Sequence, residues 1–224
     1  MRQVVLDTET TGLDPIQGHK IIEIGCVELL NRKRTGRHFH TYLNPKRAVD
    51  EGAFRVHGLS NNFLEDKPLF KERIEDLLAF IEGAELVIHN ASFDMGFLNA
   101  EFLATKWPKS VYEYVTVLDT LVLARAKHPG QRNNLDALCK RYGIQNTHRR
   151  LHGALLDAEI LVDVYLAMTG GQIDFFAQEE ESASEIKSTP EMIPSLLANA
   201  ITIPVSEEER VAHEAYMQRL LEVR

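Results

Sequence analysis

The 224-residue sequence has no run of apolar residues approaching the length of about 20 that crosses a bilayer. It contains only two cysteines, Cys26 and Cys139, which lie in separate segments without C-x-x-C spacing. This scarcity argues against a disulfide framework or a zinc site, so we expect both side chains to be small buried hydrophobes. Because the chain also enters a strand directly at its start, we expect a cytoplasmic protein without a membrane partner.

The sequence also lacks an excess of positive charge, since its formal net charge is −8. Most of this net negative charge lies in residues 169–224, which carry 11 acidic and 4 basic residues. Residues 1–168 carry the remaining 22 acidic and 21 basic residues and are therefore nearly neutral. A chain of this charge holds a polyanion weakly by itself, so binding to a nucleic acid would draw on a partner.

Hydrophobic periodicity predicts an α/β domain over residues 1–171. Apolar runs at 4–6, 20–30 and 37–43 predict strands, the last two joined by a hairpin turn. Further strands then alternate with helices, and antiparallel strands followed by such alternation indicate a mixed sheet. The later elements are strands at 85–88 and 114–118 and helices at 68–81, 93–103, 134–143 and 151–168, with another helix ending at Ala126.

The composition changes beyond residue 171. Residues 172–205 are acidic, contain three prolines and have weak periodicity, which predicts a flexible linker. Residues 206–209 read Ser-Glu-Glu-Glu, a capping box that opens a final helix over 206–224. A terminal helix without a core of its own docks either on its own domain or on a partner protein, and the sequence leaves both open.

Asp7 and Glu9 close the first apolar run and are the first candidates for chemistry. Being two residues apart on an extended backbone, they face the same side. Two like charges are tolerated there if a hard divalent cation lies between them, since Mg²⁺ and Mn²⁺ prefer carboxylate oxygen. Taken alone, such a pair is more often a solvated polar turn.

Two further segments carry candidate residues. Asp94 falls in the first turn of the helix that follows strand 85–88, near a strand end where sites of open α/β sheets gather. An acid at that position also simply stabilises the helix dipole. His152 and Asp157 are five apart on the predicted helix 151–168 and offset by roughly 140° around it, which still lets them flank one pocket. Alone, His152 is better interpreted as a capping or surface histidine.

Together these residues run in the order D-x-E, D at a strand-to-helix junction, and H-x-x-x-x-D. This order resembles the histidine-containing branch of the DEDD exonuclease superfamily. The resemblance extends over residues 3–171, and it is closest to the proofreading epsilon subunits of bacterial DNA polymerase III. It implies a ribonuclease H-like mixed five-stranded sheet flanked by helices, with a flexible C-terminal tail. The stretches that carry it are D-T-E-T-T-G-L-D, H-K-I-I-E-I-G, V-H-G-L, H-N-A-S-F-D, N-N-L-D-A-L-C-K-R-Y and L-H-G-A-L-L-D-A.

The resemblance implies a 3′→5′ exonuclease that removes misincorporated nucleotides from DNA with two divalent cations, Mg²⁺ or Mn²⁺. Two such cations about 4 Å apart provide a nucleophile and stabilise charge on the attacked phosphate. Asp7 would bridge both cations, Glu9 and Asp157 would complete one site, and Asp94 would hold the second cation directly or through water. His152 would take the proton from water, since imidazole is best matched to neutral pH.

The resemblance also implies substrate contacts. The main chain around Thr8 and Thr10 would surround the last sugar, and residues 11–13 would wedge the terminal bases. Family members often carry an acidic residue five positions before the V-H-G histidine, His57, but here that position is Gly52, with Glu51 beside it. Which of them contacts the nucleotide stays open. The candidate substrate-binding residues are Asp7, Thr8, Glu9, Thr10, His57 and Asp157.

A basic stretch follows the last predicted strand. We expect it to form a solvated face, from which a few side chains contact phosphates. His89 is expected to be structural rather than catalytic. The basic residues are Arg125, Lys127, Arg132, Lys140, Arg141, Arg149 and Arg150.

The tail suggests partners. The pentapeptide Gln172, Ile173, Asp174, Phe175 and Phe176 resembles the motif by which bacterial proteins bind the sliding clamp, although both phenylalanines could instead fold back on the last helix of the domain. The resemblance further implies a single-stranded DNA 3′ end, the alpha polymerase subunit bound through the final helix, and a small theta-like subunit.

Two other functions are weighed against this one. An RNA-trimming exonuclease of the same superfamily would need no tether, so the long tail favours the replicase. A non-catalytic bridging subunit would be expected to have lost at least one of the five site residues, and all five are present.

Overall fold

The structure is a computed structural model that describes residues 1–145 and 151–170, together with Glu207, Arg210 and His213. The chain divides into two compact units, Met1–Phe175 and Phe176–Arg224. The three described residues of the second unit are helical, and Arg210 pairs with Glu207. No helix within the described residues is long and apolar enough to cross a membrane.

The predicted linker 172–205, the candidate clamp motif 172–176 and the rest of the predicted helix 206–224 lie outside the described residues. The domain boundaries given for the tail therefore stay predictions.

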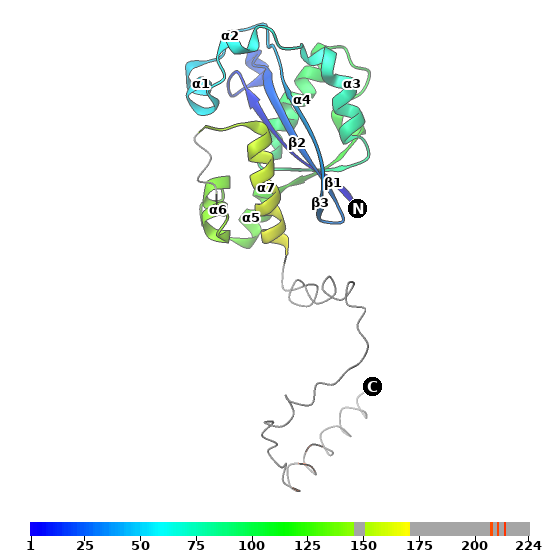
Figure 1. Cartoon of the computed structure of the whole chain (residues 1–224), viewed down its shortest axis with the longest axis vertical. Helices are drawn as coiled ribbons and strands as arrows, with labels where there is room; N and C mark the ends of the chain where they lie inside the picture. The colour runs from blue at the N-terminus through cyan, green and yellow to red at the C-terminus, as the bar shows by residue number, and fades with distance from the viewer. Residues whose placement is uncertain (146–150, 171–206, 208–209, 211–212, 214–224) are drawn as a thin grey trace, which may run out of the picture. The chain divides into compact units, whose positions relative to one another are not determined.

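A mixed five-stranded sheet forms the centre of the first unit, in the order β3-β2-β1-β4-β5 (Figure 1). The antiparallel part consists of β1 (Arg2–Thr10), β2 (Ile21–Leu30) and β3 (Lys33–Tyr42). The strands β4 (Glu85–Ile88) and β5 (Thr116–Asp119) run parallel to β1. The predicted mixed five-stranded sheet is confirmed.

Helices cover both faces of this sheet (Figure 1). Two short 3₁₀ turns, η1 (Pro15–Gln17) and η2 (Val111–Glu113), lie among the connections. The α-helices are α1 (Glu51–His57), α2 (Asn61–Leu64), α3 (Phe70–Ile81), α4 (Ala91–Ala104), α5 (Thr120–Lys127), α6 (Leu135–Tyr142) and α7 (Ala154–Thr169).

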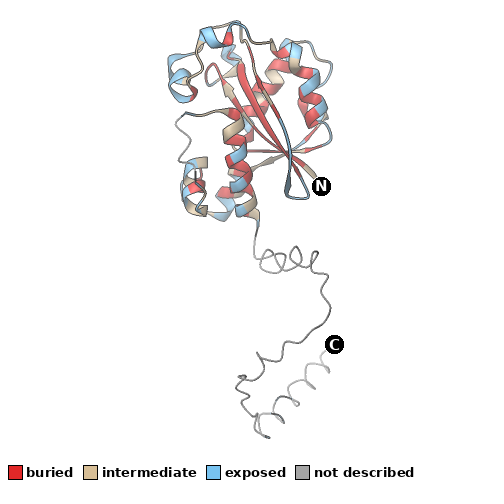
Figure 2. Ribbon diagram, viewed as in Figure 1, coloured by how far each residue is buried: buried red, intermediate tan, exposed pale blue. Residues whose placement is uncertain are grey.

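The central strand is apolar on both faces because both are covered. Val4 and Leu6 belong to a core formed with α3 and α4, whereas Val5 belongs to a second core formed with α7. Burial is accordingly continuous along the middle strands (Figure 2). Alternation of side chains across the sheet thus divides one apolar run between two cores.

The helix α7 lies between the sheet and the helices α5 and α6. One side of it joins the core with the sheet, and Ile160 and Val164 on another side join a third core with α5 and α6. Only a narrow stripe that includes Glu159 and Asp163 is exposed. Cys26 and Cys139 are both buried, as expected from the sequence.

The structure corrects several predicted boundaries. The strand β1 continues to Thr10, so that Asp7 and Glu9 lie inside the strand rather than after it. The hairpin turn is only Asn31 and Arg32, both at positive φ. The helices α1 and α2 were not predicted, because segments of seven and four residues are too short to show periodicity.

Candidate active site

Asp7 and Glu9 lie on one face of β1 and are partly exposed, while Thr8 and Thr10 on the other face are buried. The expectation that the two carboxylates share a side is therefore confirmed. Because β1 is parallel to β4 and β5, its carboxyl end meets theirs at the same edge of the sheet. The site is built at this edge, as expected for an α/β sheet.

Asp94 reaches β1 from the first turn of α4, where the sequence placed it. The side chain is buried, and Oγ1 of Thr8 donates a hydrogen bond of 2.7 Å to its Oδ1. Burial raises the pKa of Asp94 to about 7, a shift that the hydroxyl of Thr8 opposes and the charge of Asp119 increases. A carboxylate in this position is costly unless positive charge compensates it.

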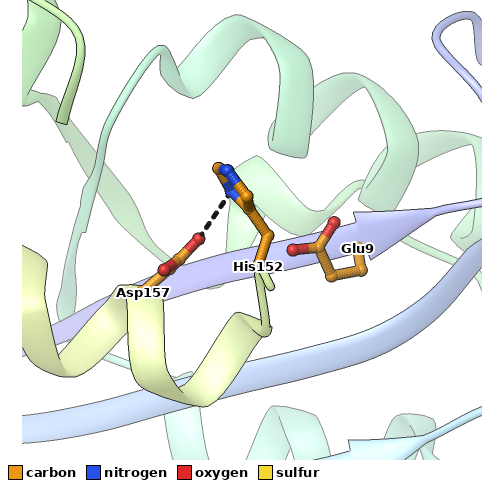
Figure 3. Close-up of side chains that lie close together, drawn as sticks. All are labelled: Glu9, His152 and Asp157. Atoms are coloured by element: carbon orange, nitrogen blue, oxygen red, sulfur yellow. Dashed lines mark hydrogen bonds and ion pairs between the residues drawn. The ribbon is translucent and has the colours of Figure 1, made fainter. Parts of the chain in front are cut away.

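Asp157 and His152 approach the end of β1 from the face of the sheet that α7 covers. Asp157 is buried in the first turn of α7, and its Oδ2 lies 3.1 Å from Nδ1 of His152 (Figure 3). The imidazole is 43 % exposed. Since an ionised carboxylate only accepts hydrogen bonds, this contact places the imidazole proton on Nδ1 and the lone pair on Nε2.

The position of His152 differs from the predicted one. The helix α7 begins at Ala154, so His152 precedes the helix instead of lying on it. Its main-chain N–H donates to the carbonyl of Val56 in α1, at 3.1 Å. Asp157 therefore meets His152 because the chain turns back before the helix, and not through an offset around a helix.

Glu9, His152 and Asp157 form one group. Each offers one ligand atom, and these atoms lie within 4.8 Å of one another (Figure 3). A carboxylate from β1, with a carboxylate and an imidazole from around the start of α7, is a suitable donor set for a divalent cation. Asp7 and Asp94 lie outside this group of three but belong to the same strand end, Asp7 through β1 itself and Asp94 through Thr8.

Gly25 allows the start of α7 to pack closely against the sheet. Gly25 on β2 is the partner of Asp7 in the antiparallel ladder. A Cβ atom at Gly25 would lie 2.3 Å from main-chain atoms of Ala154 and Leu155. The first turn of α7 thus rests directly on the sheet, which brings Asp157 beside the acidic end of β1.

Glu23 is a neighbouring acid that the sequence reasoning missed. It is the ladder partner of Glu9, is buried, and its Oε1 lies 2.7 Å from Nε2 of His40. Burial, together with the charge of Glu23 and a hydrogen bond to it, raises the pKa of Tyr42. The available signal was an acid within the mostly apolar strand β2, in the stretch H-K-I-I-E-I-G.

A cleft of about 640 Å³ opens beside the acidic strand end. Four of the expected substrate contacts line it, namely Thr8, Glu9, Thr10 and His57. Leu13, in the predicted wedge, is 84 % exposed at its border. His57 is buried at the end of α1, its Nδ1 accepts from the N–H of Leu59, and burial lowers its pKa.

The lining of the cleft also indicates which acidic residue near Gly52 is placed to contact the nucleotide. Gly52 and Asp50 both line the cleft. Glu51 is not among the described residues that line it, and it pairs with Arg55 on the next turn of α1. The acidic side chain at this place in the cleft is therefore Asp50.

His19 is a further residue that the sequence reasoning missed. Its Nδ1 lies 3.0 Å from Oγ1 of Thr11, and its Nε2 lies 3.5 Å from Asp50. The N–H of Asp50 donates to the carbonyl of Thr11, and a Cβ atom at Gly12 would strike the His19 ring at 2.3 Å. This buried imidazole therefore links the turn at residues 11–13 to Asp50 at the start of α1.

The comparisons with known proteins agree with this geometry. The exonuclease family RNase_T matches residues 4–165. The chain is 53 % identical over 222 residues to DNA polymerase III subunit epsilon of Salmonella typhimurium, covering 96 % of this chain and 91 % of that protein. It is 51 % identical to the subunit of the same name from Escherichia coli, with the same coverage.

Solved structures share the fold. Exonuclease X in complex with 5′ overhanging duplex DNA has a TM-score of 0.56 and 27 % identity, covering 79 % of this chain and 98 % of that one. Exonuclease I without ligand has a TM-score of 0.63 at 18 % identity, covering 80 % of this chain and 44 % of that one. The ribonuclease H-like α/β fold expected from the sequence is thereby confirmed.

Proposed function

Because the chain belongs to the exonuclease family RNase_T, and to the DNA polymerase III epsilon subunits within it, we propose that it proofreads DNA. It is a 3′→5′ exonuclease that removes misincorporated nucleotides as part of a bacterial replicase. The observation that carries this function is the grouping of Glu9, His152 and Asp157 beside a cleft of nucleotide size. The names of the relatives favour it over RNA trimming, and the complete set of site residues favours it over a non-catalytic bridge.

The donor set fits divalent cations held mainly by oxygen, for which Mg²⁺ or Mn²⁺ is best suited. Asp7 would hold both cations, Glu9 and Asp157 would hold one of them with it, and Asp94 would hold the other. The raised pKa of Asp94 supports this assignment, because positive charge compensates a buried carboxylate. When bound, the cations make water nucleophilic at neutral pH and neutralise charge on the attacked phosphate.

His152 acts as the general base that takes a proton from the attacking water. Its Nδ1 is held by Oδ2 of Asp157 at 3.1 Å, so the lone pair is on Nε2. This atom accepts the proton of the attacking water, and the partial exposure of the ring lets the proton pass on to solvent. Holding the imidazole in one tautomer is the contribution of Asp157 to this step.

The terminal nucleotide occupies the 640 Å³ cleft. Thr8, Thr10 and His57 surround its sugar and base, and the exposed Leu13 separates it from the preceding base. The neutral state favoured for His57 suits contact with an uncharged base. Asp50, rather than Glu51 or Gly52, supplies the acidic contact at this end of the cleft.

The partners follow from the sequence of the tail, which lies outside the described residues. The predicted helix 206–224 binds the alpha polymerase subunit, and the predicted motif 172–176 binds the sliding clamp. A small theta-like subunit is a further partner. Tethering at two points raises the effective concentration of the exonuclease at a 3′ end, which offsets the weak hold of an acidic chain on DNA. The compartment is the cytoplasm, where bacterial DNA is copied.

Two substitutions on the same helix test the proposed function. Asp157→Asn removes a carboxylate from the group with Glu9 and His152, whereas Asp163→Asn changes an exposed carboxylate that pairs with Arg34. With Mg²⁺ and a 5′-labelled single-stranded oligonucleotide, we expect Asp157→Asn to lower the rate by roughly 10²-fold or more and Asp163→Asn to leave it unchanged. Equal rates in both variants, or faster cleavage of RNA than of DNA by the native chain, would contradict the proposal.

A further inference from the structure

A second cleft, of about 670 Å³, lies at the carboxyl ends of β4 and β5. Its walls come from the turn before α4, from α5 and from the loop that leads into α6. Arg125 and Arg132 supply its charge, and Asn90 and Asn134 are among its neutral polar residues. Of the residues that the structure describes, none with an acidic side chain lines this cleft.

The surroundings of this cleft are basic in a chain that is acidic overall. Residues 120–145 contain five basic residues and one acidic residue, whereas the whole chain has a net charge of −8. Arg125 and Arg132 are exposed, and neither guanidinium takes part in a hydrogen bond or ion pair within the described residues. Both charges are therefore available to an anionic ligand.

The loop that presents Arg132 is firmly held. Nδ2 of the buried Asn133 donates to the carbonyls of His128 and Gln131, each at 3.1 Å. Arg141 donates from Nη1 to Oδ1 of Asn133 at 3.1 Å and from Nη2 to the carbonyl of Arg132 at 2.9 Å. The position of Arg132 is thus fixed by a third arginine that takes no part in lining the cleft.

Asp119 accepts hydrogen bonds from main-chain groups of residues that line the cleft. Its carboxylate accepts from the N–H groups of Asn90 and Ala91 at the start of α4, and from those of Leu121 and Val122 at the start of α5. These bonds stabilise its charge, and because Asn90 and Leu121 line the cleft, the carboxylate offsets part of the positive charge there.

The second cleft and the candidate active site share one edge of the sheet. Neighbouring strands lie about 4.8 Å apart, so Leu118 near the end of β5 is about 10 Å across β4 from Val5 of β1, which is two residues before Asp7. Asn90 in the cleft is also only four residues before Asp94, which belongs to the active site. A DNA strand that ends in the first cleft can therefore extend into the second within a few nucleotides.

We propose that the cleft at Arg125 and Arg132 binds backbone phosphates of the DNA strand a few nucleotides upstream of the cleaved bond. This inference rests on the proposed function, because it assumes that the 3′ end of that strand occupies the cleft beside Glu9. The contacts are to phosphate, so they hold the strand without reading its bases.

Binding of DNA without catalysis is the first test. In the full chain, Arg125→Gln with Arg132→Gln should bind a fluorescent 12-nucleotide single strand roughly 10-fold more weakly in EDTA. The slope of log affinity against log salt should fall by about 0.7 for each lost phosphate contact. The matched control is Lys106→Gln with Lys109→Gln, beyond the far end of the 14-residue α4, which should bind as the native chain does.

A substrate too short to reach the second cleft separates this inference from the proposed function. We expect the arginine variant to hydrolyse the p-nitrophenyl ester of thymidine 5′-monophosphate at the native rate, while its KM for the 12-nucleotide strand rises roughly 10-fold with kcat retained. Native affinity and salt slope in the arginine variant, or an equal loss in the lysine variant, would overturn the inference. A native chain that binds the strand but hydrolyses neither substrate would overturn the proposed function instead.

Discussion

Asp94 shows at the scale of one residue how a site for cations imposes a cost on the fold. The carboxyl is buried against Thr8 and its pKa is about 7, whereas an aspartate in an unfolded chain ionises near 4. The folded protein without cations therefore holds a proton that the unfolded chain has lost between these two values. Stability of the cation-free protein should rise as the pH falls from about 8 towards 5.

Asp94→Asn tests this cost directly. The amide keeps an oxygen that accepts from Thr8 but carries no charge, so the variant should be more stable than the native chain at pH 8 by up to a few kcal/mol. Thermal unfolding in EDTA from pH 5 to pH 8 should show this advantage shrinking as the pH falls. A variant that is less stable at pH 8, with no change in the difference across this range, would rule out a costly carboxylate.

His152 supports a second prediction at this scale. If Nε2 accepts the proton of water, His152→Ala should lower kcat by roughly 10²–10⁴-fold with little change in DNA binding. Its rate should recover partly as the pH rises, since hydroxide needs no base. The measurement is a pH–rate profile of variant and native chain, and profiles of the same shape would remove His152 from this role.

The roles of Asp7 and Glu9 could be predicted from the sequence, whereas the role of His19 could not. Asp7 and Glu9 were found because a strand places alternate residues on one side. His19 was missed because its partners, Thr11 and Asp50, lie 8 and 31 positions away in opposite directions. Periodicity carries no information about such contacts.

At the scale of elements, the packing of α7 on β2 decides whether the site forms. The first turn of α7 rests on Gly25, the ladder partner of Asp7. Most strands and long helices were predicted from periodicity, but this close approach was not. The start of α7 was also placed three residues early, because Gly153 and His152 are compatible with a helical pattern until the turn back to α1 is known.

Gly25→Ala should push α7 away from the sheet. A Cβ atom 2.3 Å from main-chain atoms cannot be accommodated without movement, and overpacking of this kind costs about 1–3 kcal/mol. We expect the melting temperature to fall and kcat to fall by more than 10-fold, because Asp157 moves with the helix. Both are measured on the full chain with Mg²⁺.

Gly96→Ala is the matched control for this prediction. Gly96 lies within α4, and a Cβ atom there meets nothing within 4 Å. Alanine should therefore leave activity unchanged and raise stability by about 0.5–1 kcal/mol. If Gly25→Ala behaved like this control, the close approach of α7 would not be what assembles the site.

At the scale of the whole molecule, the charge distribution separates catalysis from recruitment. Residues 1–168 are nearly neutral, and the segment 169–224 carries a net charge of −7. Such a tail would repel DNA, which suits a tether to proteins better than a grip on the substrate. Nothing in the fold of the first unit predicts these partners, so they rest on the sequence of the tail.

Replacement of Gln172, Phe175 and Phe176 by alanine tests the tether. Because aromatic side chains dominate interface energetics, the triple variant should lose clamp binding while keeping its activity on free single strands. Clamp binding is measured with purified clamp, and activity is measured separately with a labelled oligonucleotide. Undiminished clamp binding, or loss of the folded domain, would end this proposal.

The most direct measurement of the central claim is the product released from a 5′-labelled single strand, with and without divalent cations. In Mg²⁺ or Mn²⁺ the full chain should release nucleoside 5′-monophosphates one at a time from the 3′ end. With excess EDTA it should release none while its circular dichroism spectrum stays that of a folded protein, and added Mg²⁺ should restore cleavage. Continued release in EDTA, or loss of nucleotides from the 5′ end, would contradict the account.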